Sequence, residues 1–99
     1  MSRGPDAGTL LARALTESSP GLAVTAGEAT RWASATFTGA RHSIIMSGPD
    51  SCDLDGWIEA LDEHEFDLRG HLVADIGIVD IVRTDLRAEL RIEALTVEI

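Results

Sequence analysis

Ninety-nine residues are enough for one compact domain but not for two, since a chain of this length buries little more than about 60% of its unfolded surface. The formal net charge of −9 argues against a nucleic acid or an anionic membrane as a partner, because both require a basic surface. The chain contains no Lys, Asn, Gln or Tyr, and the missing Lys excludes a P-loop or a Schiff-base mechanism within it.

The single cysteine, Cys52, excludes an internal disulfide framework and is typical of a reducing compartment. The longest early apolar run, residues 10–15, is interrupted by Arg13 and is too short for a membrane span or a signal sequence. We therefore expect a cytoplasmic location. Solubility explains the acidic balance best, although the charge leaves a basic partner surface open as the alternative.

The first predicted element is a short helix close to the N-terminus. Residues 1–8 are expected to form a flexible tail, and residues 9–99 a single α+β domain. Thr9 is predicted to cap the helix, and Pro20 with Gly21 ends it. The apolar stripe of this helix consists of Leu10, Leu11, Ala14 and Leu15.

Two segments with β-forming residues follow, at positions 31–38 and 40–47. Gly39 lies between them and is predicted to supply the turn of a hairpin. Residues 22–24 are either a short strand or a packed connector. The sequence leaves the register of this hairpin open.

A second helix is predicted after residues 48–50, a Gly-Pro-Asp sequence that ends the preceding strand. Ser51 or Asp53 is expected to cap this helix. Its buried face consists of the apolar residues that recur at helical spacing, namely Leu54, Trp57, Ile58 and Leu61.

Residues 66–99 alternate between apolar and polar side chains with a period of two, which predicts one long β-hairpin. The turn is expected near residues 83–85, after a first strand of about thirteen residues. In the second strand the apolar positions change from even to odd numbers, so we expect a bulge near Ala94 that returns the last residues to the core face. The residues around Gly77 indicate a comparable irregularity in the first strand, or a stretch buried on both faces.

The predicted order is therefore helix, hairpin, helix, hairpin. Two amphipathic helices need one face of a sheet to cover, so we expect an α+β two-layer sandwich with an antiparallel sheet and both helices on one face. The order α-β-β-α-β-β is similar to a circular permutation of the ferredoxin-like β-α-β-β-α-β unit, a likeness of topology only.

The catalytic candidates form a polar row on the first strand of the long hairpin. His71 and Asp75 share their parity with Asp67 and Arg69, so the four side chains are expected on one face, about 7 Å apart. A histidine beside a carboxylate is the arrangement of a general base and its orienting group. The alternative is a solvated charge ladder paired with the returning strand. His42 either joins this site or is a half-buried histidine with local hydrogen bonds.

Residues 51–62 partly match a calcium-binding loop, with acids at positions three, five and twelve and Gly at position six. The acids are Asp53, Asp55 and Asp62. However, position one is Ser51 instead of Asp, and a strand and turn precede the motif where calcium loops have a helix. The same acids are expected at the start of any capped helix. We prefer that explanation and expect no metal and no cofactor.

The long hairpin also indicates how the chain functions. Two short helices cover only part of such a hairpin, so apolar side chains near its turn are expected to stay uncovered, and a symmetric homodimer would bury them. We predict a small non-catalytic domain that acts through self-association or protein binding. The alternative is a small enzyme or ligand-binding domain that uses the His71 face. The expected interface residues are Ile78, Val79, Ile81, Val82 and Leu86.

Overall fold

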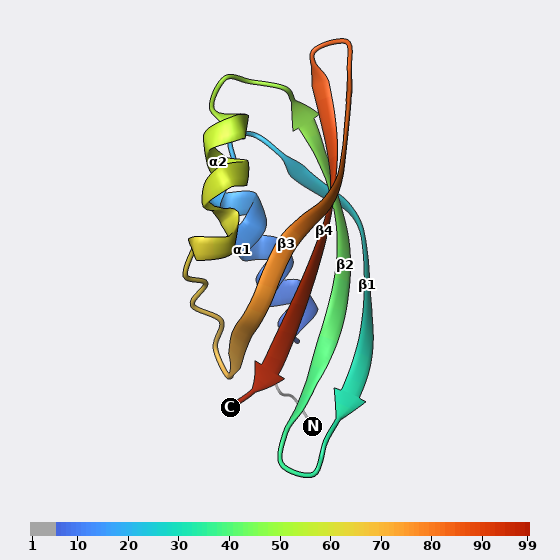
Figure 1. Ribbon diagram of the computed structural model, residues 1–99, viewed down its shortest axis with the longest axis vertical. Helices are drawn as coiled ribbons and strands as arrows, with labels where there is room; N and C mark the ends of the chain where they lie inside the picture. Colours follow the sequence, from blue (N-terminus) through green and yellow to red (C-terminus); the bar gives the residue numbers. More distant parts are fainter. Residues whose placement is uncertain (1–5) are drawn as a thin grey trace.

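The computed structural model describes residues 6–99, and within them a four-stranded antiparallel sheet is covered on one face by two helices (Figure 1). This arrangement confirms the predicted α+β class and the α-β-β-α-β-β order. The strands lie in the order β1-β2-β4-β3, which is compatible with the permuted ferredoxin-like topology. The elements are α1 (Ala7–Ser18), β1 (Ala23–Ala33), β2 (Thr38–Pro49), α2 (Leu54–Ala60), the 3₁₀ turn η1 (Leu61–Glu63), β3 (His71–Thr84) and β4 (Arg87–Glu98).

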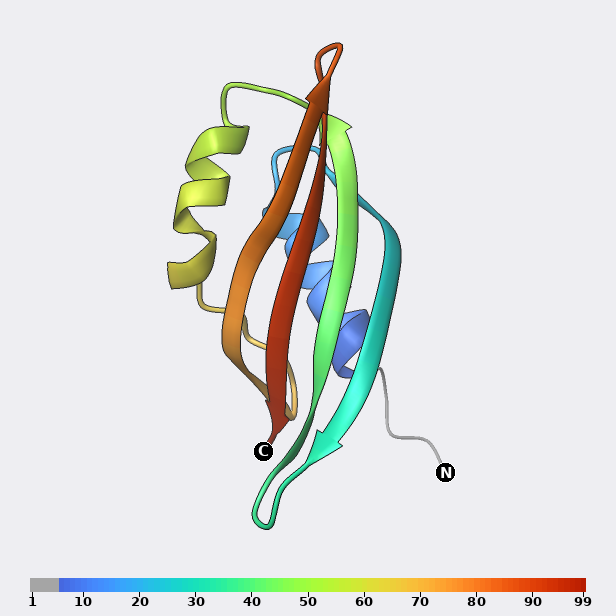
Figure 2. The ribbon, with the colours of Figure 1, turned by 45° about the vertical axis from the view of Figure 1, so that its right-hand side comes forward.

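Strand β4 is paired on both sides and organises the core. Its register against β2 is unbroken from Arg87 to Val97, so its even-numbered side chains all point to the same face. In Figure 2, α1 lies behind β1 and β2, while α2 and η1 lie beside β3. The buried core residues are Leu11, Leu15, Leu22, Ile44, Met46, Leu54, Leu61, Leu68, Ile76, Ala88, Leu90, Ile92 and Ala94.

The bulge predicted near Ala94 is wrong, because β4 keeps its register through that residue. The irregularities lie in β3 instead, where the register shifts between Val73 and Asp75 and between Ile78 and Asp80. The second shift confirms the irregularity expected near Gly77. A bulge in β4 would disrupt two ladders, whereas a bulge in the edge strand β3 disrupts only one.

The apolar odd-numbered residues at the end of β4 have another explanation. Val97 lies on the uncovered face of the sheet, opposite Gly39 of β2 and Leu72 of β3. Trp32 pairs with Gly39 from the other side, so a row of apolar residues crosses the uncovered face at this end of the sheet. The change of parity therefore marks this row.

The first hairpin turns at residues 34–37, and the prediction that Gly39 forms the turn is wrong. The Ser34 N–H donates to the Phe37 carbonyl at 2.7 Å, and the Ser34 Oγ accepts from the Phe37 N–H at 3.1 Å. Gly39 lies inside β2, where a Cβ atom would overlap the Thr96 carbonyl oxygen and approach Cζ2 of Trp32 to 2.8 Å. Glycine is thus required here for close approach and not for a turn.

Helix α1 begins three residues earlier than predicted. Its N-cap is Asp6, whose Oδ1 accepts the Thr9 N–H at 2.8 Å, so the prediction of Thr9 as the cap is wrong. Ala7 and Gly8, assigned to the tail, form the first turn, and Ala7 is buried. The rest of the expected tail, residues 1–5, lies outside the described residues.

Helix α2 begins at Leu54 with Asp53 as its N-cap residue, one of the two caps predicted, although the Asp53 side chain makes no capping hydrogen bond. The Trp57 Nε1–H donates to the Ser18 Oγ at 3.1 Å, which ties α2 to the end of α1. No helix within residues 6–99 is long and apolar enough to cross a bilayer.

The close approach at Gly39 yields a first prediction. Gly39→Ala should lower the free energy of unfolding by about 1–3 kcal/mol, because the new methyl group must displace the β4 backbone or the Trp32 ring. Gly77→Ala is the matched control, since a Cβ at Gly77 would meet no atom within 4 Å. Urea unfolding of both variants measures the difference. Equal midpoints for the two variants would contradict the packing described here.

Candidate functional site

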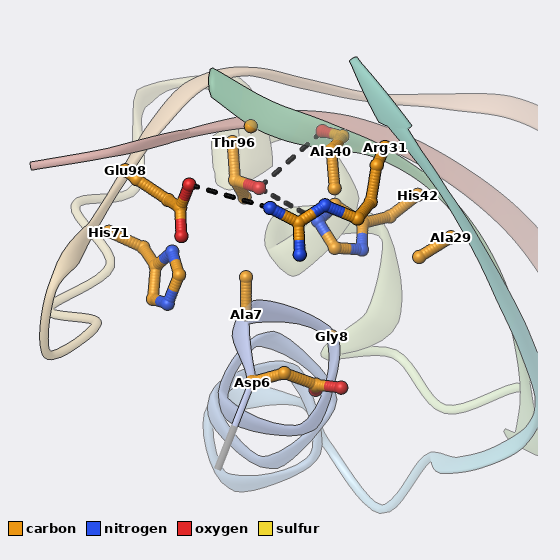
Figure 3. A pocket seen from close by; sticks show the side chains of 11 residues that line it. Asp6, Ala7, Gly8, Ala29, Arg31, Ala40, His42, His71, Thr96 and Glu98 are labelled. Atoms are coloured by element: carbon orange, nitrogen blue, oxygen red, sulfur yellow. Dashed lines mark hydrogen bonds and ion pairs between the residues drawn. The ribbon is translucent and has the colours of Figure 1, made fainter. Parts of the chain in front are cut away.

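A pocket that contains a buried histidine lies where the start of α1 meets one end of the sheet (Figure 3). Its volume is about 160 Å³, which corresponds to roughly five water molecules at their share of liquid volume. The pocket brings distant parts of the chain together, because Asp6 precedes α1, His71 begins β3 and Glu98 ends β4. The lining residues are Asp6, Ala7, Gly8, Ala29, Arg31, Gly39, Ala40, His42, His71, Thr96 and Glu98.

His42 is the buried polar group of this pocket. Its side chain extends from β2 on the helix-covered face, and the residue is only 4% exposed. The Nε2 atom lies 2.9 Å from the Oγ1 of Thr96, which is fully buried on β4. The shared parity of His42 with Ile44 and Met46 correctly places it on the core face. However, the residue is buried and not half-buried, and its hydrogen-bond partner lies on another strand and is not local in sequence.

The Thr96 hydroxyl determines which ring nitrogen of His42 carries the proton. We assign the single proton of Thr96 Oγ1 to the Ala40 carbonyl oxygen, 3.4 Å away, because this oxygen can only accept, and in that arrangement Oγ1 accepts from His42. We therefore assign the proton to Nε2, which leaves a lone pair on Nδ1. Nδ1 faces the first turn of α1, since a Cβ on Gly8 would lie 3.6 Å from it. Burial lowers the pKa of His42, and the Asp6 carboxylate only partly opposes this effect.

Charged groups surround this neutral ring. The N–H of Thr9 holds the pKa of the Asp6 carboxyl below its ordinary value, so Asp6 is ionised. Arg31 of β1 and Glu98 of β4 form an ion pair with an Nη2–Oε2 distance of 3.8 Å. The Nδ1 atom of His71 is buried and has no hydrogen-bond partner among the described residues.

The structure does not bring the predicted polar row together. His71 is the first residue of β3, opposite Glu98, and lines the pocket beside α1. The bulge at Ala74 reverses the alternation, so Asp75 points to the uncovered face and lines a different pocket. Asp67 lies in the loop before β3 and is exposed. His71 therefore lines the same pocket as His42, the combination that the sequence left open, and Asp75 does not line it.

The three aspartates considered for a metal are arranged around α2 and η1. Residues 6–99 contain no group of three or more His, Cys, Asp or Glu side chains that could hold a metal ion. Asp53 is the N-cap residue of α2, and Asp62 lies in η1. The Asp55 carboxylate instead accepts a hydrogen bond from Arg83 at 2.5 Å. Asp53 and Asp55 thus belong to the start of α2, and Asp62 lies in the 3₁₀ turn that follows its end.

Sequence reasoning missed four of the pocket's polar residues: Asp6, Arg31, Thr96 and Glu98. Asp6 was assigned to the tail, and the bulge expected at Ala94 would have turned Thr96 away from the core. Thr96 continues the even-numbered series of β4, so the unbroken alternation was the signal that could have found it. Arg31 lies on the pocket side of the sheet because it pairs with Ala40, which lines the same pocket, and the sequence left this strand register open.

A second candidate surface is the end of the β3–β4 hairpin, which extends beyond both helices (Figure 1). Four of the five predicted interface residues are exposed there: Ile81 at 38%, Val79 at 49%, Val82 at 50% and Leu86 at 86%. Ile78 instead packs against the core and is not accessible in the same way.

The turn of this hairpin has an unusual backbone. It consists of Asp85 and Leu86, with φ angles of 49° and 68°, one or two residues later than expected. Both positive angles suit a two-residue hairpin turn, in which glycine or asparagine is the preferred second residue. A leucine at such a position costs about 1–2 kcal/mol.

Arg83 connects the hairpin end to the start of α2. Its guanidinium group pairs with Asp55 and lies 3.7 Å from Asp50. The hydrogen bond to Asp55 and the nearby charge of Asp50 raise the pKa of Arg83. The Asp50 N–H also donates to the Leu86 carbonyl at 2.8 Å, so the turn is held in place from the β2–α2 loop.

The hairpin end is electrically balanced, unlike the chain as a whole. Residues 79–91 carry three acids and three arginines, so the net charge of −9 belongs entirely to the rest of the chain. The acids and arginines alternate along the hairpin: Asp80, Arg83, Asp85, Arg87, Glu89 and Arg91.

Comparison with known protein families, curated proteins and solved structures finds no match to this chain.

The lowered pKa of His42 predicts a pH-dependent stability. The unfolded chain binds a proton near the ordinary histidine pKa of about 6.5, whereas folded His42 binds it only at lower pH. The free energy of unfolding contributed by neutral His42 is therefore fully present above the ordinary histidine pKa of about 6.5, and it is lost as the pH falls below that value. His42→Gln should be less stable than the wild type at neutral pH, and the difference in the free energy of unfolding between the two proteins should become smaller in acid. Urea midpoints at about pH 7.5 and 5.5 test this. A gap that stays constant would contradict it.

Proposed function

We propose that this chain is a non-catalytic association domain that pairs with a second copy of itself through the end of the β3–β4 hairpin. The proposed contact consists of the exposed apolar side chains at the hairpin end, Val79, Ile81, Val82 and Leu86, which we call the hairpin-end patch. The patch includes both faces of the hairpin, because Ile81 pairs with Leu90 on the helix-covered face and Val82 pairs with Glu89 on the uncovered face. We further propose a cytoplasmic location, with which the free, exposed Cys52 is consistent.

Leu86 carries this proposal. It is 86% exposed, so it contributes almost nothing to the core. Its φ angle of 68° also makes it unfavourable for the local backbone, where glycine would be better. A large apolar side chain that neither the core nor the turn requires is explained if a partner covers it.

The charge distribution supports a second copy as the partner. Two copies of a chain with a net charge of −9 repel each other over most of their surfaces. Residues 79–91 are the exception, because their three acids and three arginines balance. Arg83 is paired within its own chain, but in an isologous contact Asp85 of one copy can face Arg87 of the other.

The size of the patch supports a weak dimer. A fully buried Val, Ile or Leu side chain contributes about 1.5–3 kcal/mol, and the four patch residues of each copy begin partly exposed. The entropy cost of association offsets much of this gain. We therefore expect a dimer that dissociates on dilution, rather than an obligate one.

Leu86→Gly tests the proposal because its two effects have opposite signs. The monomer should become more stable, by about 1 kcal/mol, since glycine suits the positive φ angle. The dissociation constant of the dimer should rise about tenfold or more, because the interface loses two leucines, one from each copy. Light scattering after gel filtration across a dilution series measures association, and urea unfolding of dilute protein measures stability.

The control for this variant is Phe37→Ser. Phe37 is also an exposed apolar turn residue, but it lies in the β1–β2 turn at the other end of the sheet. Its replacement should leave the dimer unchanged. A wild-type chain that is monomeric throughout the dilution series, or a Leu86→Gly variant with the wild-type mass at each concentration, would overturn the proposal.

Val79→Glu and Ile81→Glu provide a second test of the same patch. Each adds a buried negative charge to the proposed interface, and both should convert the dimer to monomer. Because both residues are exposed in the single chain, cooperative unfolding should be retained. Variants that keep the dimeric mass would place the interface elsewhere.

A further inference from the structure

We propose that the pocket between the start of α1 and the sheet binds a small organic cation with N–H donors, such as an amidinium or a primary ammonium group. This proposal is independent of association, because the pocket and the hairpin-end patch lie at opposite ends of the sheet (Figure 1).

The first argument is the acceptor that His42 presents to the pocket. The ring is 4% exposed and is fixed by the hydrogen bond from Nε2 to Thr96. With the Thr96 proton assigned to Ala40, the Nδ1 lone pair is the part of the ring that can accept from a ligand. An N–H group is the natural partner for such a lone pair.

The second argument is the charge of the lining. It includes two carboxylates, Asp6 and Glu98, and one guanidinium, Arg31. Arg31 pairs with Glu98, and Asp6 has no cation pair among the described residues. With His42 neutral, the excess negative charge lies on the α1 side of the pocket, where Figure 3 places Asp6 below the imidazole. A cation would complement it, whereas an anion would meet Asp6 at the helix N-terminus.

The third argument is the unsatisfied Nδ1 of His71. This atom is buried without a partner among the described residues, and His71 lines the same pocket as His42. Buried ring nitrogens without partners are costly, so a ligand that reaches His71 would gain a hydrogen bond. In Figure 3 the two rings lie on opposite sides of the pocket above Ala7, and the Arg31 guanidinium is drawn between them.

The volume limits the ligand to a few heavy atoms. About 160 Å³ accommodates an amidine or a short alkylamine but not a nucleotide or a sugar. A bare metal ion does not fit the donor set, since residues 6–99 contain no group of three or more metal-ligating side chains. The site therefore suits a small cation with directional donors, held with millimolar affinity because so few ligand atoms take part.

Acetamidinium and acetamide are matched probes, because they have the same shape and differ in charge. Long-range ¹H–¹⁵N NMR spectra of the histidine rings would first report the tautomer of His42, and then follow titration with each probe. Acetamidinium should cause saturable shifts of the His42 and His71 nitrogens, and should shift His64 little. Acetamide should bind at least several-fold more weakly, and acetate should not bind.

Asp6→Asn is the matched protein variant, since asparagine keeps the helix cap but removes the charge. It should weaken acetamidinium binding about tenfold while the tautomer of His42 stays the same. Asp67→Asn, which removes an exposed carboxylate outside the pocket, should have no effect. The proposal is overturned if neither ring shows saturable shifts, if acetamide or acetate binds as well as acetamidinium, or if the two variants behave alike.

Discussion

The unbroken register of β4 is the constraint on which the rest of the structure depends. The strand is hydrogen-bonded on both sides, to β2 and to β3, so a bulge in it would break two ladders at once. Its even-numbered residues consequently form one continuous face from Ala88 to Thr96. The helices cover that face, and every irregularity of the sheet is displaced into the edge strands.

The displaced irregularities decide which polar groups meet. The bulge at Ala74 separates His71 from Asp75, although a regular strand would place them on one face. The same bulge leaves His71 on the side of α1, beside the pocket that contains His42. Meanwhile the regular strand β4 carries Thr96 to within hydrogen-bond distance of His42. The pocket is thus a consequence of one regular strand next to one irregular strand.

The fold could be predicted from the sequence because its signals are local and periodic. The alternation in residues 66–99 and the helical spacing of Leu54, Trp57, Ile58 and Leu61 depend only on neighbours along the chain. The two layers follow from the number of amphipathic elements. Each of these predictions concerned the pattern of an element and not its partner.

The errors arose where one residue type serves two purposes. Gly39 was read as a turn, but it permits the Thr96 backbone and the Trp32 ring to approach β2. Val97 was read as a core residue behind a bulge, but it belongs to the apolar row on the uncovered face. Asp6 was read as tail, but it caps α1 and gives the pocket its charge. These roles depend on cross-strand partners, which a single sequence does not specify.

The pocket and the hairpin-end patch differ in how far the stability of the fold explains their residues. Thr96 satisfies the buried Nε2 of His42, so much of the pocket's polarity is already explained by the stability of the sheet. Leu86 has no such explanation, since its backbone conformation and its exposure both oppose a leucine. A residue that strains the monomer backbone and contributes almost nothing to its core is more informative about function than a group that the fold requires. For this reason the hairpin end, and not the pocket, determines the function that we assign to the chain.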